Sequence, residues 1–166
     1  GATADGMKAE AKIVKLIGQG ALVIDRTPFY AESGGQVGDA GVIDGDGFRF
    51  RVEDTQKYGD VIVHMGTIEA GDAKSLPKTV RAEVDIARRR AIMANHTGTH
   101  LLHQALHEVV GKHATQQGSL VAPDRLRFDF THTKALSPEE IESIEMRINA
   151  RIAGNTQLKT TVEDLA

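Results

Sequence analysis

The chain has 166 residues, enough to bury a hydrophobic core in one domain of ordinary size or in two small ones. Its 40% hydrophobic and 26% charged residues are typical of a globular protein and exclude the composition of a disordered chain. The formal net charge of -3 excludes a protein that coats nucleic acid through charge alone. No apolar run is long enough to span a membrane, no secretory signal opens the chain, and the absence of Cys excludes disulfides. We therefore expect a cytoplasmic protein without a membrane partner.

The first part of the chain is rich in glycine, since 13 of the 17 glycines precede Ala73. Short apolar runs between the turn-forming residues predict strands. These runs lie at residues 11–17, 21–24, 47–52, 61–65 and 79–84. Apolar and charged residues alternate in the third run, which places Phe48, Phe50 and Val52 on one face. We expect residues 1–85 to form a glycine-rich antiparallel subdomain that is similar to a β-barrel.

A helical pattern follows from Asp85, which suits an N-cap, to about Val110. Asn95 is also a good N-cap, so the pattern allows either one helix or two. Four histidines share one side of this helix, within an arc of about 60° that lies nearly opposite the apolar stripe. They are His96, His100, His103 and His107. This position disfavours buried core histidines and leaves open a solvated helix face, which is the simpler explanation for the last two.

The last part of the chain predicts a half-buried strand at residues 125–130, followed by a second helix. That helix begins at Ser137, an N-cap followed by Pro138 at the first helical position and by Glu140 as capping-box partner. An isoleucine stripe continues along it until Gly154. The pattern as a whole predicts an α+β fold, with residues 86–166 as a mixed helix and sheet subdomain that carries the histidines.

Two of the histidines, His96 and His100, have the spacing of a metal-binding pair. Helix residues at i and i+4 lie about 6 Å apart on one face, so both rings can reach one ion. Zinc takes three or four nitrogen, sulfur or oxygen ligands, so the pair is half of a site. A basic run at residues 88–90, with Arg125 and Arg127, is a candidate RNA contact, although an arginine triplet is more often a solvated face.

A second unusual segment, residues 27–39, surrounds a single amide side chain with turn-forming residues. It lacks the Lys and the following Ser or Thr of a P-loop, and its glycine spacing differs from the dinucleotide-binding fingerprint. Gly34 and Gly35 favour a tight turn that joins two strands. A functional loop around Gln36 is the alternative.

Three separated motifs, at residues 27–39, 95–103 and 116–130, strongly resemble the editing domain of the alanyl-tRNA synthetases. The resemblance covers nearly the whole chain. Freestanding AlaX-type editing proteins share this domain, and threonyl-tRNA synthetases share its histidine-bearing half. In this family the HxxxH histidines bind zinc, which implies zinc as the cofactor of His96 and His100. The other family ligands are a Cys and a His of a later CxxxH motif. Because this chain has no Cys, we expect a fragment that stops before those ligands, binds zinc weakly and is inactive by itself.

The resemblance also implies hydrolysis of the ester that joins serine or glycine to tRNA(Ala), with the acceptor end of that tRNA as partner. A synthetase pocket shaped for alanine cannot strongly reject a smaller side chain or one with an added hydroxyl, so a second site removes the errors. The implied site residues are Thr99 and Gln116 as catalytic candidates, and Gly34, Gly35, Gln36 and Arg88 as substrate-binding candidates.

ATP and aminoacylation are implied only for the parent synthetase, because this chain carries none of the ATP-binding motifs of a class II synthetase core. The rest of that synthetase is then a partner within the same chain. Two alternatives remain open. One is a freestanding trans-editing hydrolase with the same chemistry, and the other is a noncatalytic tRNA-binding module that keeps the fold without the site.

Overall fold

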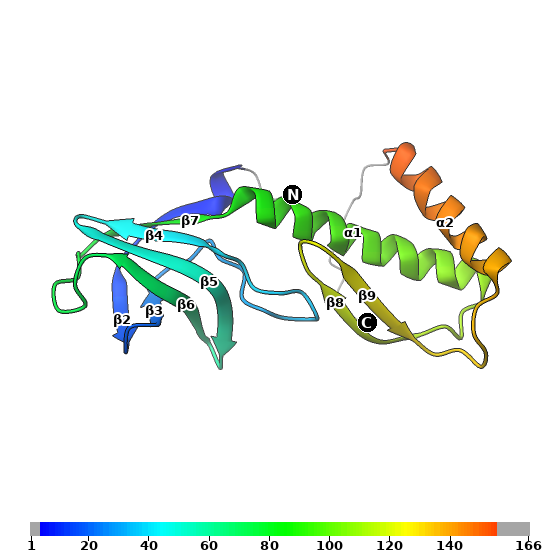
Figure 1. Ribbon diagram of the computed structural model, residues 1–166, viewed down its shortest axis with the longest axis horizontal. Helices are drawn as coiled ribbons and strands as arrows, with labels where there is room; N and C mark the ends of the chain where they lie inside the picture. The colour runs from blue at the N-terminus through cyan, green and yellow to red at the C-terminus, as the bar shows by residue number, and fades with distance from the viewer. Residues whose placement is uncertain (1–3, 156–166) are drawn as a thin grey trace, which may run out of the picture.

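A computed structural model describes residues 4–155, and it shows an elongated molecule in which one long helix joins a β-sheet to a smaller part (Figure 1). The sheet has seven antiparallel strands in the order β1-β7-β4-β5-β6-β3-β2, and it forms a half-barrel. A short 3-10 helix, η1 (Ala4–Met7), precedes it. The strands are β1 (Lys8–Ala11), β2 (Ile13–Ile17), β3 (Ala21–Ile24), β4 (Gly41–Gly45), β5 (Phe48–Tyr58), β6 (Val61–Ala70) and β7 (Val80–Val84). The α+β class is confirmed, with a half-barrel in the first part.

Alternation along β5 decides which face of the sheet is buried. Phe48, Phe50 and Val52 are at most 3% exposed, whereas Arg49 and Arg51 point to solvent. Apolar residues from the neighbouring elements complete this core, namely Met7, Ala11, Leu22, Ile24, Phe29, Ile43, Val80, Ala82 and Val84. The predicted inward face of β5 is confirmed, and its burial is a main source of the stability of the half-barrel.

The strand expected at residues 11–17 is confirmed from Ile13 onward as β2, whereas Ala11 ends a separate strand, β1. The break is at Lys12, whose backbone N–H donates to the Asp25 carboxylate at 2.7 Å. β1 pairs with β7 and β2 pairs with β3, so the two strands lie at opposite edges of the sheet. Only Lys12 separates Ala11 from the apolar residues of β2, so the sequence pattern alone places Ala11 in the same run.

Strand β4 is not predicted by the sequence pattern, because the glycines at its ends are typical of turns. In the sheet they allow close packing instead. A Cβ atom on Gly41 would overlap the carbonyl oxygen of Glu83, and one on Gly45 would lie 2.8 Å from the carbonyl oxygen of Thr79. Strands β5 and β6 are also longer than expected, since they pair with each other along most of their length.

Helix α1 (Ile86–Val109) is one continuous helix that runs from the sheet into the second part (Figure 1). Asp85 caps it as expected, because its carboxylate accepts the backbone N–H of Arg88 at 3.0 Å. The alternative of a second helix that begins at Asn95 is wrong. The Asn95 side chain donates to the carbonyl oxygen of Ala122 at 2.7 Å, so it joins α1 to the chain beyond the next strand.

The second part packs a β-hairpin and another helix against α1. The hairpin consists of β8 (Gln116–Val121) and β9 (Leu126–Phe130), and the helix is α2 (Pro138–Ala153). Ser137 and Glu140 form the expected capping box at the start of α2. The predicted start of this helix is therefore confirmed.

The isoleucine stripe of α2 is buried only near its middle. Ile144 is 5% exposed and packs against Ala105 and Leu106 of α1, whereas Ile141 and Ile152 are 45% and 60% exposed. No helix among the described residues is long and apolar enough to cross a membrane. Residues 156–166 of the expected second subdomain lie outside the described residues.

Candidate active site

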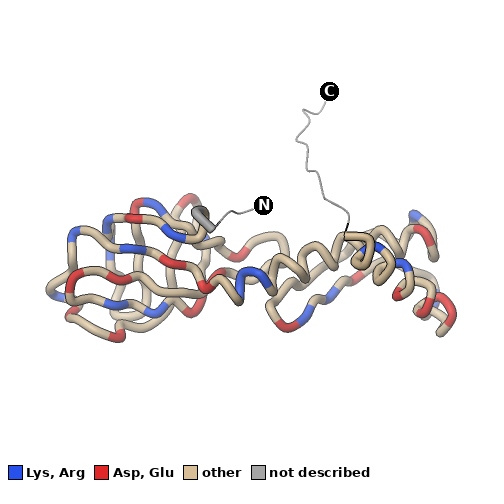
Figure 2. Tube along the Cα trace, turned by 90° about the horizontal axis from the view of Figure 1, so that it is seen from above, with Lys and Arg blue, Asp and Glu red and all other residues tan. Residues whose placement is uncertain are grey.

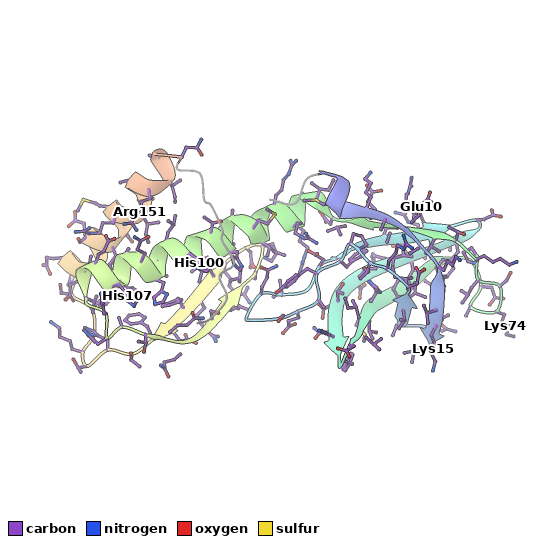
Figure 3. All side chains as sticks on the ribbon, turned by 180° about the vertical axis from the view of Figure 1, so that it is seen from behind. Glu10, Lys15, Lys74, His100, His107 and Arg151 are labelled. Atoms are coloured by element: carbon purple, nitrogen blue, oxygen red, sulfur yellow. The ribbon has the colours of Figure 1, made fainter. Side chains whose placement is uncertain are left out.

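A small cavity of about 150 Å³ lies between α1, the β8–β9 hairpin and the glycine-rich loop that follows β3. Figure 3 labels His100 on the stretch of α1 that lies beside the hairpin. The lining residues come from all three segments and are Gly34, His96, Thr99, His100, His103, Gln116, Ser119, Val121 and Phe128. The fold thus brings together five of the candidate site residues from separate motifs, namely Gly34, His96, Thr99, His100 and Gln116.

The rings of His96 and His100 face each other at the edge of this cavity. Their Nε2 atoms are 3.1 Å apart and their ring centroids 4.9 Å apart. The Nδ1–H of His96 donates to the amide oxygen of Gln36 at 2.9 Å. Because that oxygen only accepts, Nδ1 of His96 carries the proton, and the acceptor nitrogen of His96 is Nε2, which faces Nε2 of His100. The two rings therefore converge on one point through their outer nitrogens.

This donor set fits a pair of zinc ligands. Zinc binds neutral imidazole nitrogen, and a ligating histidine usually donates its other ring N–H to an oxygen, as His96 does. Within residues 4–155, no three or more His, Cys, Asp or Glu side chains are grouped so that they could hold a metal ion. The histidine pair thus supplies two ligands, and the described part of the chain does not supply a third acidic or histidine ligand.

Gly34 and Gly35 form the predicted tight turn, although it lies within a loop instead of joining two regular strands. Ser33 and Gln36 exchange backbone hydrogen bonds of 3.1 and 3.0 Å across the turn. Gly35 has a φ of 83°, and a Cβ atom there would overlap the carbonyl oxygen of Ser119. Only glycine can therefore bring this turn so close to the hairpin.

The two catalytic candidates reach the cavity from different elements. The Thr99 hydroxyl donates to the carbonyl oxygen of Asn95 at 2.9 Å, within α1, which leaves its lone pairs as acceptors. The side-chain amide of Gln116, on the exposed start of β8, donates to the Ser119 hydroxyl at 3.1 Å. The polar side chains of Thr99, Gln116 and Ser119 thus present hydrogen-bond donors and acceptors to the same small cavity.

Arg88 lies outside this cavity, at the start of α1, where its guanidinium donates to the carbonyl oxygen of Gly38 at 2.8 Å. Figure 2 shows the basic run at residues 88–90 in blue where α1 leaves the sheet. On the hairpin, Arg125 and Arg127 form exposed ion pairs with neighbouring aspartates, Asp124 and Asp129. The arginines expected to contact RNA are thus divided between two places, and four of the five have partners within the chain, namely Arg88, Arg89, Arg125 and Arg127.

His103 lines the cavity, although the sequence favours an ordinary solvated histidine at this position. Its ring centroid lies 5.0 Å from that of Phe128 and 4.3 Å from that of His107. Among the described residues its buried Nε2 atom has no hydrogen-bond partner. Burial lowers the pKa of His103, and the nearby His107 and His100 lower that pKa further. The lowered pKa favours a neutral ring, which together with Phe128 forms an aromatic side of the cavity.

Three further lining residues, Ser119, Val121 and Phe128, have no marked sequence signal. They reach the cavity only because the hairpin folds back onto α1. The alternation of apolar and charged residues along β9 places Phe128 on the inner face of the strand, and this is the one sequence feature that indicates its position.

Comparison with known proteins gives concordant matches. A family model described as "tRNA synthetases class II (A)" matches residues 2–88. An alanine–tRNA ligase of Legionella pneumophila (strain Corby) is 49% identical over 156 residues, which are 94% of this chain and 18% of the relative. An alanine–tRNA ligase of Roseiflexus sp. (strain RS-1) is 60% identical over 136 residues, which are 81% of this chain and 15% of the relative. The chain spans less than a fifth of the length of these relatives.

Proposed function

Because the chain belongs to the family of class II (A) tRNA synthetases, we propose that it is the part of an alanine–tRNA ligase that hydrolyses mischarged tRNA(Ala). The substrates are the esters of serine and glycine, and the acceptor end of tRNA(Ala) is the partner. ATP and aminoacylation belong to the rest of the ligase, and the cytoplasm is the proposed location. One observation carries the proposal: His96, His100, Thr99 and Gln116 line the same cavity.

The size and polarity of the cavity suit the side chains that are to be removed. A volume of about 150 Å³ is well below that of a site for a drug-sized ligand, and it suits a side chain as small as that of serine or glycine. Thr99, Gln116 and Ser119 offer hydrogen bonds to a seryl hydroxyl, which alanine lacks. The site therefore distinguishes serine from alanine by the seryl hydroxyl, a group that the aminoacylation pocket of the ligase cannot strongly reject.

The reaction is a hydrolysis of one ester bond. Water attacks the carbonyl carbon, the bond from that carbon to the ribose oxygen breaks, and the oxygen leaves with a proton as the terminal hydroxyl of the tRNA. His96 and His100 would hold zinc, which when bound supplies a Lewis acid. Thr99 and Gln116 fix the position of the aminoacyl group, while His103 and Phe128 provide the aromatic side of the cavity.

Deacylation assays on a complete alanine–tRNA ligase that contains this region test the proposal. We expect the enzyme to hydrolyse Ser-tRNA(Ala) much faster than Ala-tRNA(Ala). In the Gln116→Leu variant we expect the rate of Ser-tRNA(Ala) hydrolysis to fall at least tenfold. Gln117→Leu is the matched control, because Gln117 is an exposed neighbour on β8 outside the cavity. Equal tRNA binding without any deacylation would instead favour a noncatalytic binding module.

A further inference from the structure

We infer that Gln36 is a positioning residue for a metal ligand: its amide oxygen holds His96 in the form whose Nε2 lone pair faces His100. This inference rests on the metal site of the proposed function and goes beyond it. The sequence resemblance suggests Gln36 as a substrate contact. The structure places the amide oxygen of Gln36 within hydrogen-bonding distance of His96, while the lining of the cavity includes Gly34 of the same turn.

The first support is the direction of the hydrogen bonds. The distance from Gln36 Oε1 to His96 Nδ1 is 2.9 Å, and the distance from His96 Nε2 to His100 Nε2 is 3.1 Å. A neutral imidazole has one N–H donor and one acceptor nitrogen, so an acceptor at Nδ1 determines which nitrogen is free. An oxygen acceptor on the far nitrogen is the usual outer partner of a histidine that binds a metal.

The second support is the rigid placement of Gln36. On one side of it, the carbonyl oxygen of Gly35 accepts the N–H of Val121 at 2.8 Å, and on the other side the N–H of Val37 donates to the carbonyl oxygen of Val121 at 3.0 Å. Gln36 and Val121 thus form a parallel bridge to the end of β8. A half-buried side chain between two fixed backbone contacts loses little further freedom when it binds His96.

The third support is a separate connection between the same loop and the same helix. Three residues after Gln36, the buried carboxylate of Asp39 binds Arg89 of α1. Arg89 lies about two turns before His96 on that helix. The loop is therefore held to both the hairpin and α1, which fixes the backbone from which the Gln36 side chain extends to His96.

The test compares Gln36→Met, which removes the acceptor at similar size, with Gln36→Glu, which keeps an oxygen acceptor. In the 166-residue chain, NMR correlations between ring protons and ring nitrogens report the protonated nitrogen of His96, and titration with Zn²⁺ alone reports affinity. We expect an Nδ1–H ring in the wild type and in Gln36→Glu. In Gln36→Met we expect a mixture of tautomers and an approximately 10–100-fold weaker Zn²⁺ affinity. The control variant Gln117→Leu keeps the wild-type values.

Three results would overturn the inference. One is a wild-type His96 that is protonated at Nε2, which requires no variant and is readable even if Gln36→Met misfolds. The second is a Gln36→Met variant with unchanged tautomer and unchanged Zn²⁺ affinity. The third is an Nδ1–H ring in the wild type with no Zn²⁺ response at His96 or His100, which removes the metal from the role of Gln36. Deacylation by the complete ligase is measured separately, so failure of the proposed function is distinguished from each of these results.

Discussion

Arg89 binds the carboxylate of Asp39, and this buried ion pair joins the glycine-rich loop to the helix that carries both candidate zinc ligands. The Nε atom of Arg89 lies 2.9 Å from each carboxylate oxygen, and the side chains of Asp39 and Arg89 are only 1% and 12% exposed. The guanidinium also donates to the carbonyl oxygen of Pro28 at 3.0 Å, and the carboxylate accepts the backbone N–H of Tyr30 at 2.7 Å. The pair thus connects both ends of the loop to α1.

Replacement of Arg89 should be strongly destabilising. Arg89→Met leaves the Asp39 carboxylate buried without its cationic partner, and the loss of one partner of a buried ion pair typically costs about 3–5 kcal/mol. Urea unfolding of the 166-residue chain measures this loss. Arg81→Met is the matched control, because Arg81 forms an exposed ion pair with Asp44, and such pairs contribute about 0–1 kcal/mol. Equal losses in the two variants would contradict a special role for the buried pair.

The two glycines of the turn should differ in their tolerance of alanine. Gly34 has a φ of 58°, but the position that a methyl group would take is open space, so Gly34→Ala should cost about 1–2 kcal/mol through backbone strain alone. Gly35→Ala adds an overlap with the carbonyl oxygen of Ser119 and should displace the turn from the hairpin. We expect Gly35→Ala to lose more stability in urea unfolding than Gly34→Ala, and to reduce deacylation by the complete ligase more strongly. The opposite order would show that the turn is not packed as described.

Stability should decrease on mild acidification because of His64. This ring is fully buried, its Nδ1–H donates to the carbonyl oxygen of Leu22 at 2.9 Å, and its Nε2 atom accepts the Thr27 hydroxyl at 2.7 Å. Burial lowers the pKa of His64, and the bond to Leu22 only partly opposes this shift. The unfolded chain, with a histidine pKa of about 6.5, then takes up the proton first. The stability that the neutral His64 ring contributes is therefore fully present above about pH 6.5. It is lost as the pH falls towards the lower pKa that His64 has in the folded protein.

Urea unfolding at pH 7.5 and at pH 5.5 measures this dependence. His64→Gln should lower stability at pH 7.5 and reduce the difference between the two pH values. The remaining difference includes His103, whose pKa is lowered as well. Gln117→Leu is the control, since Gln117 is exposed and carries no titratable group, so this variant should leave the pH dependence unchanged. An undiminished difference in His64→Gln would assign the pH dependence to other groups.

Zinc affinity should depend on residues beyond the histidine pair. Two imidazole ligands hold zinc weakly, so the 166-residue chain should bind it far less tightly than a complete alanine–tRNA ligase. His100→Gln should abolish the binding by the chain, whereas His107→Gln, on the same side of α1, should retain it because His107 contacts the carbonyl oxygen of Ala114. Isothermal titration with Zn²⁺ measures both. Binding that survives His100→Gln would place the metal elsewhere.

Local sequence signals determined much of the secondary structure. The alternation of Phe48, Phe50 and Val52, the cap at Asp85, and the capping box at the start of α2 all involve residues within a few positions of one another. Interactions of that kind have the same geometry wherever the segment lies in the fold, so they can be predicted before the fold is known. The spacing of His96 and His100 belongs to this group, because one helix turn determines it.

Long-range packing decided which distant segments meet. The separation of β1 from β2 at opposite edges, the continuity of α1 past Asn95, and the contact of Gln36 with His96 all depend on pairing between residues far apart in the chain. Asp39 and His103 carry no sequence mark of their roles, because burial is a property of the assembled parts. Local patterns in the chain therefore determined most of the elements and the histidine pair, whereas the family resemblance supplied the other candidate residues. The packing of the loop and hairpin against α1 decided which of those residues share one cavity, since only close contact across the fold brings their side chains within hydrogen-bonding distance.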